Sequence, residues 1–233
     1  MNNVNQSFRM SRIRSTDLAD HNALAKTEVC IIGAGAIGSN VAYLLGKLGV
    51  GRLVIFDDDV VAEENLEPQF YGGLDVGERK VDAIADTVMT TVPDVRITAI
   101  PTRFEADQVI DMPVLVSGVD SIESRKEIAR ALMDQKDHWR YYIDGRMGGN
   151  ILELYFVTPD RIRNYWFKLL EARPLEIPCS ARATSYNGMM IASYIARYVA
   201  AISKEQPLPE YLHIDLLGWS FEKGRLQQQS AVL

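Results

Sequence analysis

The stretch Val29-Cys-Ile-Ile-Gly-Ala-Gly-Ala-Ile-Gly38 decides the fold of this chain. Residues 29–32 are apolar without alternation, which is typical of a parallel strand that is covered on both faces. Gly33, Gly35 and Gly38 then follow in the spacing G-x-G-x-x-G. In this spacing the first glycine allows a tight turn, the second lets a phosphate approach the backbone, and the third lets a helix pack closely on the strand. The stretch therefore predicts a strand–turn–helix unit that binds a nucleotide, with a purely structural glycine turn as the alternative.

The residues after the turn complete this unit. Apolar residues recur there at helical spacing, which predicts a helix with one buried face: Val41, Leu44, Leu45 and Leu48. The N-terminus of that helix would direct unpaired N–H groups at a phosphate. A second apolar strand ends in the cluster Asp57-Asp58-Asp59, and Asp57 falls about 20 residues after the turn, where an acid binds ribose hydroxyls. Asp59 is a second nucleotide-binding candidate, although Asp58 and Asp59 also suit a solvent-exposed loop.

Strands and helices continue to alternate after the acidic cluster. Helices are predicted to begin at Lys80 and after Ser121. Strands are predicted over 96–100, 114–119 and 141–143, of which 114–119 is expected to be buried. This order predicts an α/β fold with a mainly parallel sheet that is flanked by helices.

Three polar residues follow the ends of predicted strands: Asp57, Asp120 and Arg146. Ligands bind beyond the carboxyl ends of the strands in sheets of this kind. We therefore expect these side chains to converge on one rim, although Asp120 also suits the cap of the next helix.

The sequence changes character from Asn150 onward. Residues 151–157 alternate in part, as in an antiparallel strand. Residues 159–188 carry proline, arginine and aromatic residues without a clear period, and we expect a loop-rich crossover that covers the site. An apolar helix over 189–202 and a last strand over 211–219 are predicted to follow. The C-terminal strands of the sheet are therefore expected to be antiparallel.

The length of 233 residues suits one domain. We expect an N-terminal arm at 1–27, a nucleotide-binding half at 28–149, and antiparallel strands, a crossover loop and a helix at 150–233. The net charge of −6 argues against nucleic acid as a partner. No apolar run approaches the roughly 20 residues that a membrane span needs, and the N-terminus is unlike a signal peptide.

Cysteine usage points to a reducing compartment. The two cysteines, Cys30 and Cys179, cannot build a disulfide framework, so a cytoplasmic location is expected. There is no C-x-x-C pair, which makes a cysteine zinc site improbable.

The order of motifs closely resembles the ThiF/MoeB/HesA family, the bacterial form of the ubiquitin-activating-enzyme superfamily. The resemblance runs from about Arg9 to Phe221. It rests on GAGAIG at 33–38, DDDVVAEENLEPQ at 57–69, Lys80 after Val76-Gly77, SGVDS at 117–121 with Arg125, GRMGG at 145–149, and Ile177-Pro-Cys179.

The resemblance implies a Rossmann-like fold and a homodimer that binds ATP with magnesium. It further implies adenylation of the C-terminal Gly-Gly carboxylate of a small β-grasp protein, either ubiquitin-like or a sulfur carrier. Many relatives then pass the acyl group to a thiol. The sequence does not name the carrier or the pathway that follows.

The resemblance also implies roles for individual residues. Those that would contact ATP or its metal are Gly35 at the phosphates, Asp57 at the ribose, Asn65 and Gln69 in the family's Asn-Leu-x-Arg-Gln segment, Lys80 at a phosphate, and Asp120 at magnesium. Cys179 stands where many members have the acyl-accepting cysteine. Arg12 or Arg14 would reach across a dimer to the partner's ATP, although a solvated arm explains these arginines equally well.

The chemistry of adenylation suits these residue types. A carboxylate oxygen must attack the α-phosphorus while pyrophosphate leaves, so positioning and cancellation of phosphate charge dominate. Magnesium prefers one or two carboxylates together with phosphate oxygens, which suits Asp120. Lys80 supplies a positive charge without a change of protonation.

Two departures from the family pattern limit this transfer. The arginine of Asn-Leu-x-Arg-Gln is Pro68 here, so one cation that faces the phosphates is missing. Its place could be taken by another arginine or by a partner subunit, or turnover could be weaker; the candidate arginines are Arg12, Arg14, Arg79 and Arg146. The zinc-binding C-x-x-C pairs of MoeB and ThiF are also absent.

Other interpretations stay open. A NAD-dependent oxidoreductase would use the same glycine turn and acid, but it leaves Lys80 and Asp120 without a function. A catalytically impaired relative that binds ATP or a partner is favoured by Pro68. At single positions, Lys80 could be an exposed helix-start lysine, Asn65 a turn residue, and Cys179 a small buried side chain.

Overall fold

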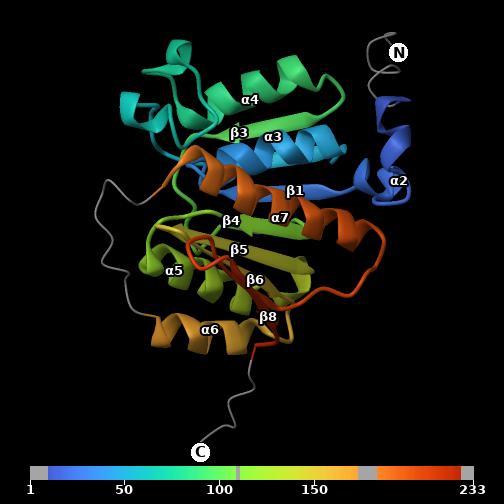
Figure 1. The fold of residues 1–233 in the computed structure, drawn as a ribbon, viewed down its shortest axis with the longest axis vertical. Helices are drawn as coiled ribbons and strands as arrows, with labels where there is room; N and C mark the ends of the chain where they lie inside the picture. The colour runs from blue at the N-terminus through green and yellow to red at the C-terminus, as the bar shows by residue number, and fades with distance from the viewer. Residues whose placement is uncertain (1–9, 109–110, 173–182, 227–233) are drawn as a thin grey trace, which may run out of the picture.

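One eight-stranded sheet runs through the protein in a computed structural model, which describes residues 10–108, 111–172 and 183–226. Its strands are β1 Glu28–Ile32, β2 Arg52–Phe56, β3 Arg96–Ile100, β4 Val114–Ser117, β5 Tyr141–Gly148, β6 Ile151–Val157, β7 Tyr211–Asp215 and β8 Ser220–Gly224. They lie in the order β3-β2-β1-β4-β5-β6-β7-β8 (Figure 1). The first five strands pair in parallel, and the last three pair antiparallel. The predicted fold class, mainly parallel with antiparallel C-terminal strands, is confirmed.

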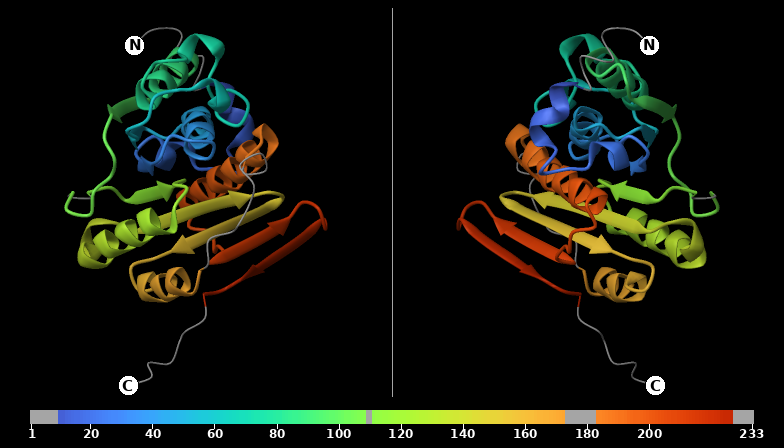
Figure 2. Two further views of the ribbon diagram at one scale, coloured as in Figure 1. Left: turned by 90° about the vertical axis from the view of Figure 1, so that its left-hand side faces the viewer. Right: turned by 90° about the vertical axis from the view of Figure 1, so that its right-hand side faces the viewer.

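Helices cover both faces of this sheet (Figure 2). α3 Gly38–Leu48, α4 Lys80–Thr91 and α7 Ser185–Ser203 pack on one face, and α5 Ile122–Asp134 and α6 Ile162–Glu171 pack on the other. The shorter helical segments are η1 Arg12–Ser15, α2 His21–Leu24, η2 Glu63–Asn65, η3 Gly73–Asp75 and η4 Lys136–His138. Among the described residues, none of the helices combines the length and apolar character needed to cross a membrane.

The unbroken apolar run of β1 is explained by this layering. Successive strand residues point to opposite faces, so Val29 and Ile31 enter one core while Cys30 and Ile32 enter the other. Both faces of the strand are therefore buried, as predicted from the lack of alternation.

The glycine turn between β1 and α3 depends on two of its three glycines. Gly33 has φ +92°, a conformation that a side chain disfavours. A Cβ on Gly38 would lie 1.7 Å from the carbonyl oxygen of Gly33, so α3 could not start so close to the strand. A Cβ on Gly35 would meet no atom within 4 Å. The first and third glycines therefore shape the backbone, and the second leaves open space.

The crossover after β6 was predicted wrongly in part. Residues 159–188 were expected to be loop-rich, but α6 occupies Ile162–Glu171 and α7 begins at Ser185. Ile162, Tyr165 and Leu169 form the buried face of α6 at spacings of three and four residues. Exposed apolar neighbours, such as Phe167, obscured that period in the sequence.

The C-terminal strand also differs from expectation. Residues 211–219 were predicted as one strand, but the chain turns after Asp215 and returns as β8. The Asp215 carboxylate accepts the N–H groups of Leu217 and Gly218, which closes this turn. Near the N-terminus, Asp20 caps the short helix α2.

Candidate active site

A cleft of about 1240 Å³ opens at the carboxyl ends of the central strands. Its walls come from the glycine turn, the end of β2, the start of α4, the start of α5, and the β5–β6 pair. Most residues that the sequence assigned to a nucleotide site line it: Gly33, Gly35, Asp57, Asp59, Gln69, Lys80 and Asp120. The expected convergence on one rim is therefore what the structure shows.

Asp57 is fixed beside the glycine turn. Its carboxylate accepts the N–H of Ala34 at 2.7 Å and the N–H of Asp59 at 2.9 Å. Burial raises the pKa of Asp57 above its ordinary value, although the two backbone donors and Lys80 oppose this shift. The carboxylate is thus held where β2 ends, against the turn that precedes α3.

Lys80 is not an exposed helix-start lysine. It is the first residue of α4, yet its side chain is only 7% exposed, and its Nζ lies 2.7 Å from a carboxylate oxygen of Asp59. The Asp59 side chain is 65% exposed, so this ion pair faces solvent at the mouth of the cleft. Asp59 therefore fixes the position of the Lys80 ammonium group at the wall of the cleft.

The segment after the acidic cluster divides into two parts. The Asn65 side chain accepts the N–H of Ala62 at 3.0 Å and closes η2, and Asn65 does not line the cleft. Gln69 does line the cleft, and its buried Oε1 has no hydrogen-bond partner among the described residues. Gln69 is therefore the member of this pair that is positioned to contact a ligand.

Asp120 is exposed at the cleft wall. It does not cap the helix after it, because the Ser121 hydroxyl accepts the N–H of Ser124 and caps α5. Arg125 holds this loop in place, since its guanidinium donates to the carbonyls of Val119 and Gly145. The Asp120 carboxylate is thus presented to the cleft from a braced loop.

The arginines that could replace the cation missing at Pro68 lie in different places. Arg12 pairs with Asp94 at 2.8 Å and donates to the carbonyl of Gly46, near the C-terminal end of α3. An 11-residue helix is about 16 Å long, so η1, which carries Arg12 and Arg14, lies far from the glycine turn of its own chain. Arg79 is exposed and pairs with Asp82 outside the cleft. Of these candidates, Arg146 lines the cleft.

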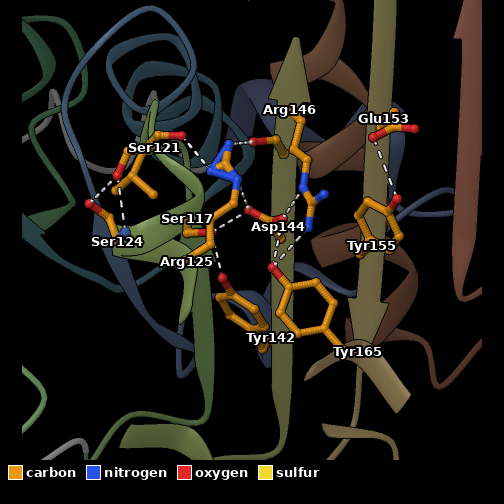
Figure 3. A network of polar contacts seen from close by, with 12 residues as sticks. Ser117, Ser121, Ser124, Arg125, Tyr142, Asp144, Arg146, Glu153, Tyr155 and Tyr165 are labelled. Atoms are coloured by element: carbon orange, nitrogen blue, oxygen red, sulfur yellow. Dashed lines mark hydrogen bonds and ion pairs between the residues drawn. The ribbon is translucent and has the colours of Figure 1, made fainter. Parts of the chain in front are cut away.

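A buried polar network lies beside Arg146 and was missed from the sequence (Figure 3). Asp144 is fully buried on β5 and accepts hydrogen bonds from Ser117 at 2.6 Å, Tyr165 at 2.7 Å and Arg146 at 2.7 Å. Arg125 approaches the same carboxylate to 3.6 Å. The available signal was Asp144 and Arg146 two residues apart, which places both on one face of a strand.

The charges in this network are mutually stabilised. Burial alone would raise the pKa of Asp144, but Arg125, Arg146 and the hydrogen bonds outweigh it and lower that pKa. The pKa of Arg146 is raised because the attraction of Asp144 outweighs the cost of burial. Burial raises the pKa of Tyr165, so this tyrosine stays a neutral donor. Asp144 and Arg146 are therefore both charged at neutral pH.

Of the two cysteines, only Cys30 lies among the described residues. Cys30 is buried in the core, and burial raises the pKa of its thiol to about 12, so it is unreactive. Cys179 lies outside the described residues, and its role as a nucleophile stays a prediction. Ala172 and Ala183, which flank the undescribed segment, both line the cleft.

Comparison with known proteins identifies the class of protein. The model of the ThiF family matches residues 9–231, and the chain therefore belongs to the ThiF family. The resemblance that the motifs indicated is confirmed.

Curated relatives include ubiquitin-like modifier-activating enzyme 5 from two invertebrates. The protein from Caenorhabditis elegans is 28% identical over 135 residues, which are 52% of this chain and 32% of the relative. The protein from Drosophila grimshawi is 30% identical over 146 residues, which are 56% of this chain and 37% of the relative. The match thus spans about a third of the length of these relatives.

Solved structures share the fold. E. coli MccB in complex with MccA-N7isoASN aligns with a TM-score of 0.75 and 16% identity, over 91% of this chain and 68% of that chain. PaaA aligns with a TM-score of 0.71 and 17% identity, over 90% and 67%.

Proposed function

We propose that this chain adenylates the C-terminal carboxylate of a small ubiquitin-like or sulfur-carrier protein that ends in Gly-Gly. A carboxylate oxygen attacks the α-phosphorus of ATP, the bond to the β-phosphate oxygen breaks, and pyrophosphate leaves. The observation that carries the proposal is the convergence of Gly35, Asp57, Lys80 and Asp120 on one cleft. Membership of the ThiF family supports it.

In this proposal the nucleotide lies over the ends of β2, β1 and β4. Asp57 accepts the ribose hydroxyls, and the open space at Gly35 admits the phosphates. Lys80 and the N-terminus of α3 offset phosphate charge. Because the reacting groups are positioned in this way, the adenylation step needs no covalent catalysis by the protein.

Magnesium fits the residues that are present. Asp57 and Asp59 are engaged by Ala34 and Lys80, whereas Asp120 is exposed at the cleft and takes no part in capping α5. A single carboxylate with phosphate oxygens is a usual magnesium environment. Asp120 would hold the ion, which supplies positive charge to the leaving pyrophosphate when bound.

The experiment that tests the proposal is ATP–pyrophosphate exchange with a candidate carrier that ends in Gly-Gly. We expect exchange in the wild type and its loss in Asp120→Ala, while Asp160→Ala, an exposed acid outside the cleft, keeps it. Exchange that is unchanged in Asp120→Ala would refute this mechanism.

A second step, acyl transfer to Cys179, is a separate part of the proposal. The thiolate would displace AMP from the acyl adenylate and form a thioester. We predict a conjugate with the carrier that dithiothreitol removes, absent in Cys179→Ala and retained in Cys30→Ala, because Cys30 is a core residue. Denaturing electrophoresis with and without reductant measures it, and a conjugate that survives Cys179→Ala excludes this acceptor.

Two rival functions have direct tests. A NAD-dependent oxidoreductase would bind NAD in preference to ATP with magnesium, and calorimetric titration of both separates them. A relative without turnover, which Pro68 favours, would bind ATP tightly and give no exchange with any carrier.

We further propose a cytoplasmic homodimer in which each chain acts as a single adenylation domain. Arg14 supports the dimer. This exposed arginine lies at the opposite end of α3 from the glycine turn of its own chain, so it is better placed to reach a nucleotide that is bound to a second chain.

A further inference from the structure

Arg146 lies where the sheet changes from parallel to antiparallel. The parallel pairing of β4 with β5 ends at Ser117 and Asp144, and Arg146 follows two residues later on the same face of β5. On its other edge β5 pairs antiparallel with β6 over Tyr142–Gly148, and Arg146 stands opposite Glu153 in that pairing. The side chain is therefore at the carboxyl rim, and it lines the cleft.

The guanidinium of Arg146 is held on three sides. Its Nε donates to Asp144 at 2.7 Å, and its Nη2 donates to the Tyr165 hydroxyl at 3.2 Å. The group also lies over the ring of Tyr155, 4.3 Å from the centroid. Nη1 has no acceptor among the described residues, and the side chain is 13% exposed. Arg146 is thus pre-oriented with one donor edge left for a ligand.

Within the described part of the chain, the nearby carboxylates Asp144 and Glu153 do not pair with that edge. Asp144 is shared between Arg125 and Arg146. Glu153 accepts from the hydroxyls of Tyr155 and Tyr211 and lies 3.5 Å from His213. A guanidinium edge of this kind binds a carboxylate or a phosphate through charge-assisted hydrogen bonds.

Position in the sheet favours a carboxylate. The glycine turn follows β1, and β5 is two strands away, which is about 10 Å across the sheet. Lys80 lies on the other side of β1, in α4, at the nucleotide end. Arg146 therefore lies beside the proposed phosphate site, at a distance that the carboxyl end of a substrate could span.

We propose that the free edge of Arg146 binds the C-terminal carboxylate of the substrate. One carboxylate oxygen stays on Nη1 while the other attacks the α-phosphorus, and the first becomes the acyl carbonyl oxygen when pyrophosphate leaves. This inference rests on the proposed adenylation and assigns its substrate-binding group.

The test uses N-acetyl-Gly-Gly with a free carboxylate and the same compound as its C-terminal amide. Each is titrated into the full chain with α,β-methylene-ATP and magnesium, and the arginine Nε–H signals are followed by NMR. We expect the carboxylate to shift the Arg146 signal and to bind about tenfold tighter than the amide, which corresponds to about 1.4 kcal/mol. Arg146→Gln should abolish this preference and leave the affinity for ATP within about twofold.

Arg161→Gln is the matched control. Arg161 is a partly exposed arginine that pairs with Glu210 at 3.4 Å outside the cleft, so the preference should persist in this variant. If Arg146→Gln does not fold, Arg146→Lys is used in its place. Lysine keeps the positive charge but lacks the planar guanidinium with its paired donors, so the preference for the carboxylate over the amide should fall to about threefold or less. A preference that survives the Arg146 substitution overturns the inference. A tenfold loss of ATP affinity with the preference intact also overturns it and assigns the edge to a phosphate.

The two proposals fail separately. A carboxylate preference that depends on Arg146, without ATP–pyrophosphate exchange for any carrier, leaves this inference standing and removes the proposed function. Conversely, if ATP–pyrophosphate exchange occurs but Arg146→Gln leaves the KM for the carrier unchanged, the proposed function stands and this inference is removed.

Discussion

The three glycines of the turn after β1 have different physical roles. Gly38 lets α3 start against the carbonyl of Gly33, whereas Gly35 borders open space in the cleft. The spacing predicted these roles one by one, and the structure agrees for the turn at Gly33 and the close packing at Gly38. The phosphate contact at Gly35 stays a prediction.

Substitution at Gly35 and Gly38 should therefore separate binding from folding. Gly35→Ala should change the free energy of unfolding by no more than about 1 kcal/mol and weaken ATP binding, since its Cβ enters only the space for the phosphates. Gly38→Ala should destabilise the protein by at least about 3 kcal/mol, because its Cβ meets the backbone at Gly33. Urea unfolding and ATP titration measure the two effects. Equal losses of stability in both variants would contradict this division.

Lys80 should act on the phosphates and not on the nucleoside. Lys80→Met removes a charge-assisted contact worth about 1.5–3 kcal/mol, so ATP affinity should fall by at least about tenfold while adenosine affinity is retained. Arg79→Met is the neighbouring control, because Arg79 pairs with Asp82 outside the cleft. Calorimetry with both ligands checks this. An equal loss of adenosine affinity would contradict the prediction that Lys80 acts on the phosphates.

At the scale of elements, β5 depends on its buried carboxylate. Asp144→Asn leaves Arg125 and Arg146 buried without a counterion, and we expect a loss of about 3–5 kcal/mol in the free energy of unfolding. Because the pKa of Asp144 is lowered, this stabilisation is present at neutral pH and is lost as the pH falls through the folded-state pKa. Urea unfolding measures it, and Asp160→Asn, at an exposed acid, should cost little. Equal stability of the two variants would show that Asp144 is dispensable.

Elements with one strong local signal were predictable from the sequence. Val29–Ile32 and Val114–Ser117 are short apolar runs bounded by glycine or polar residues, and both are strands. α6 was missed because Phe167 and Leu170 are apolar but exposed, which conceals the face that packs on the sheet. The turn before β8 was missed because it depends on side-chain hydrogen bonds from Asp215.

The candidate site was predictable where a residue belongs to a local motif. Asp57 was predicted from its spacing after the turn, and Lys80 from its place in the motif order of the family that the chain resembles. The network at Asp144 was not, because it joins β4, β5, α5 and α6, and such a meeting has no fixed spacing along the chain. Long-range packing decides which of these side chains meet.

At the scale of the whole molecule, the position of Arg14 predicts that two chains share each site. Mixing Arg14→Ala chains with Asp120→Ala chains should restore about a quarter of the wild-type exchange, because half of the dimers then carry one intact site of two. Each variant alone should be inactive. The mixture is measured after subunit exchange, by ATP–pyrophosphate exchange with the same carrier. A mixture that stays inactive, although mixed dimers form, would place Arg14 outside the partner's site.

Strand β5 has a consequence for how such a protein can change its substrate. On one edge Tyr141–Asp144 pair in parallel with β4, toward the proposed nucleotide end of the cleft, and on the other edge Tyr142–Gly148 pair antiparallel with β6, toward its other end. The part of the reaction that is common to every adenylation is thereby separated from the part that differs between substrates. New specificity can be grafted beyond Asp144, on β6, β7 and α6, while the nucleotide half is kept intact. The fold is in this sense modular within a single sheet.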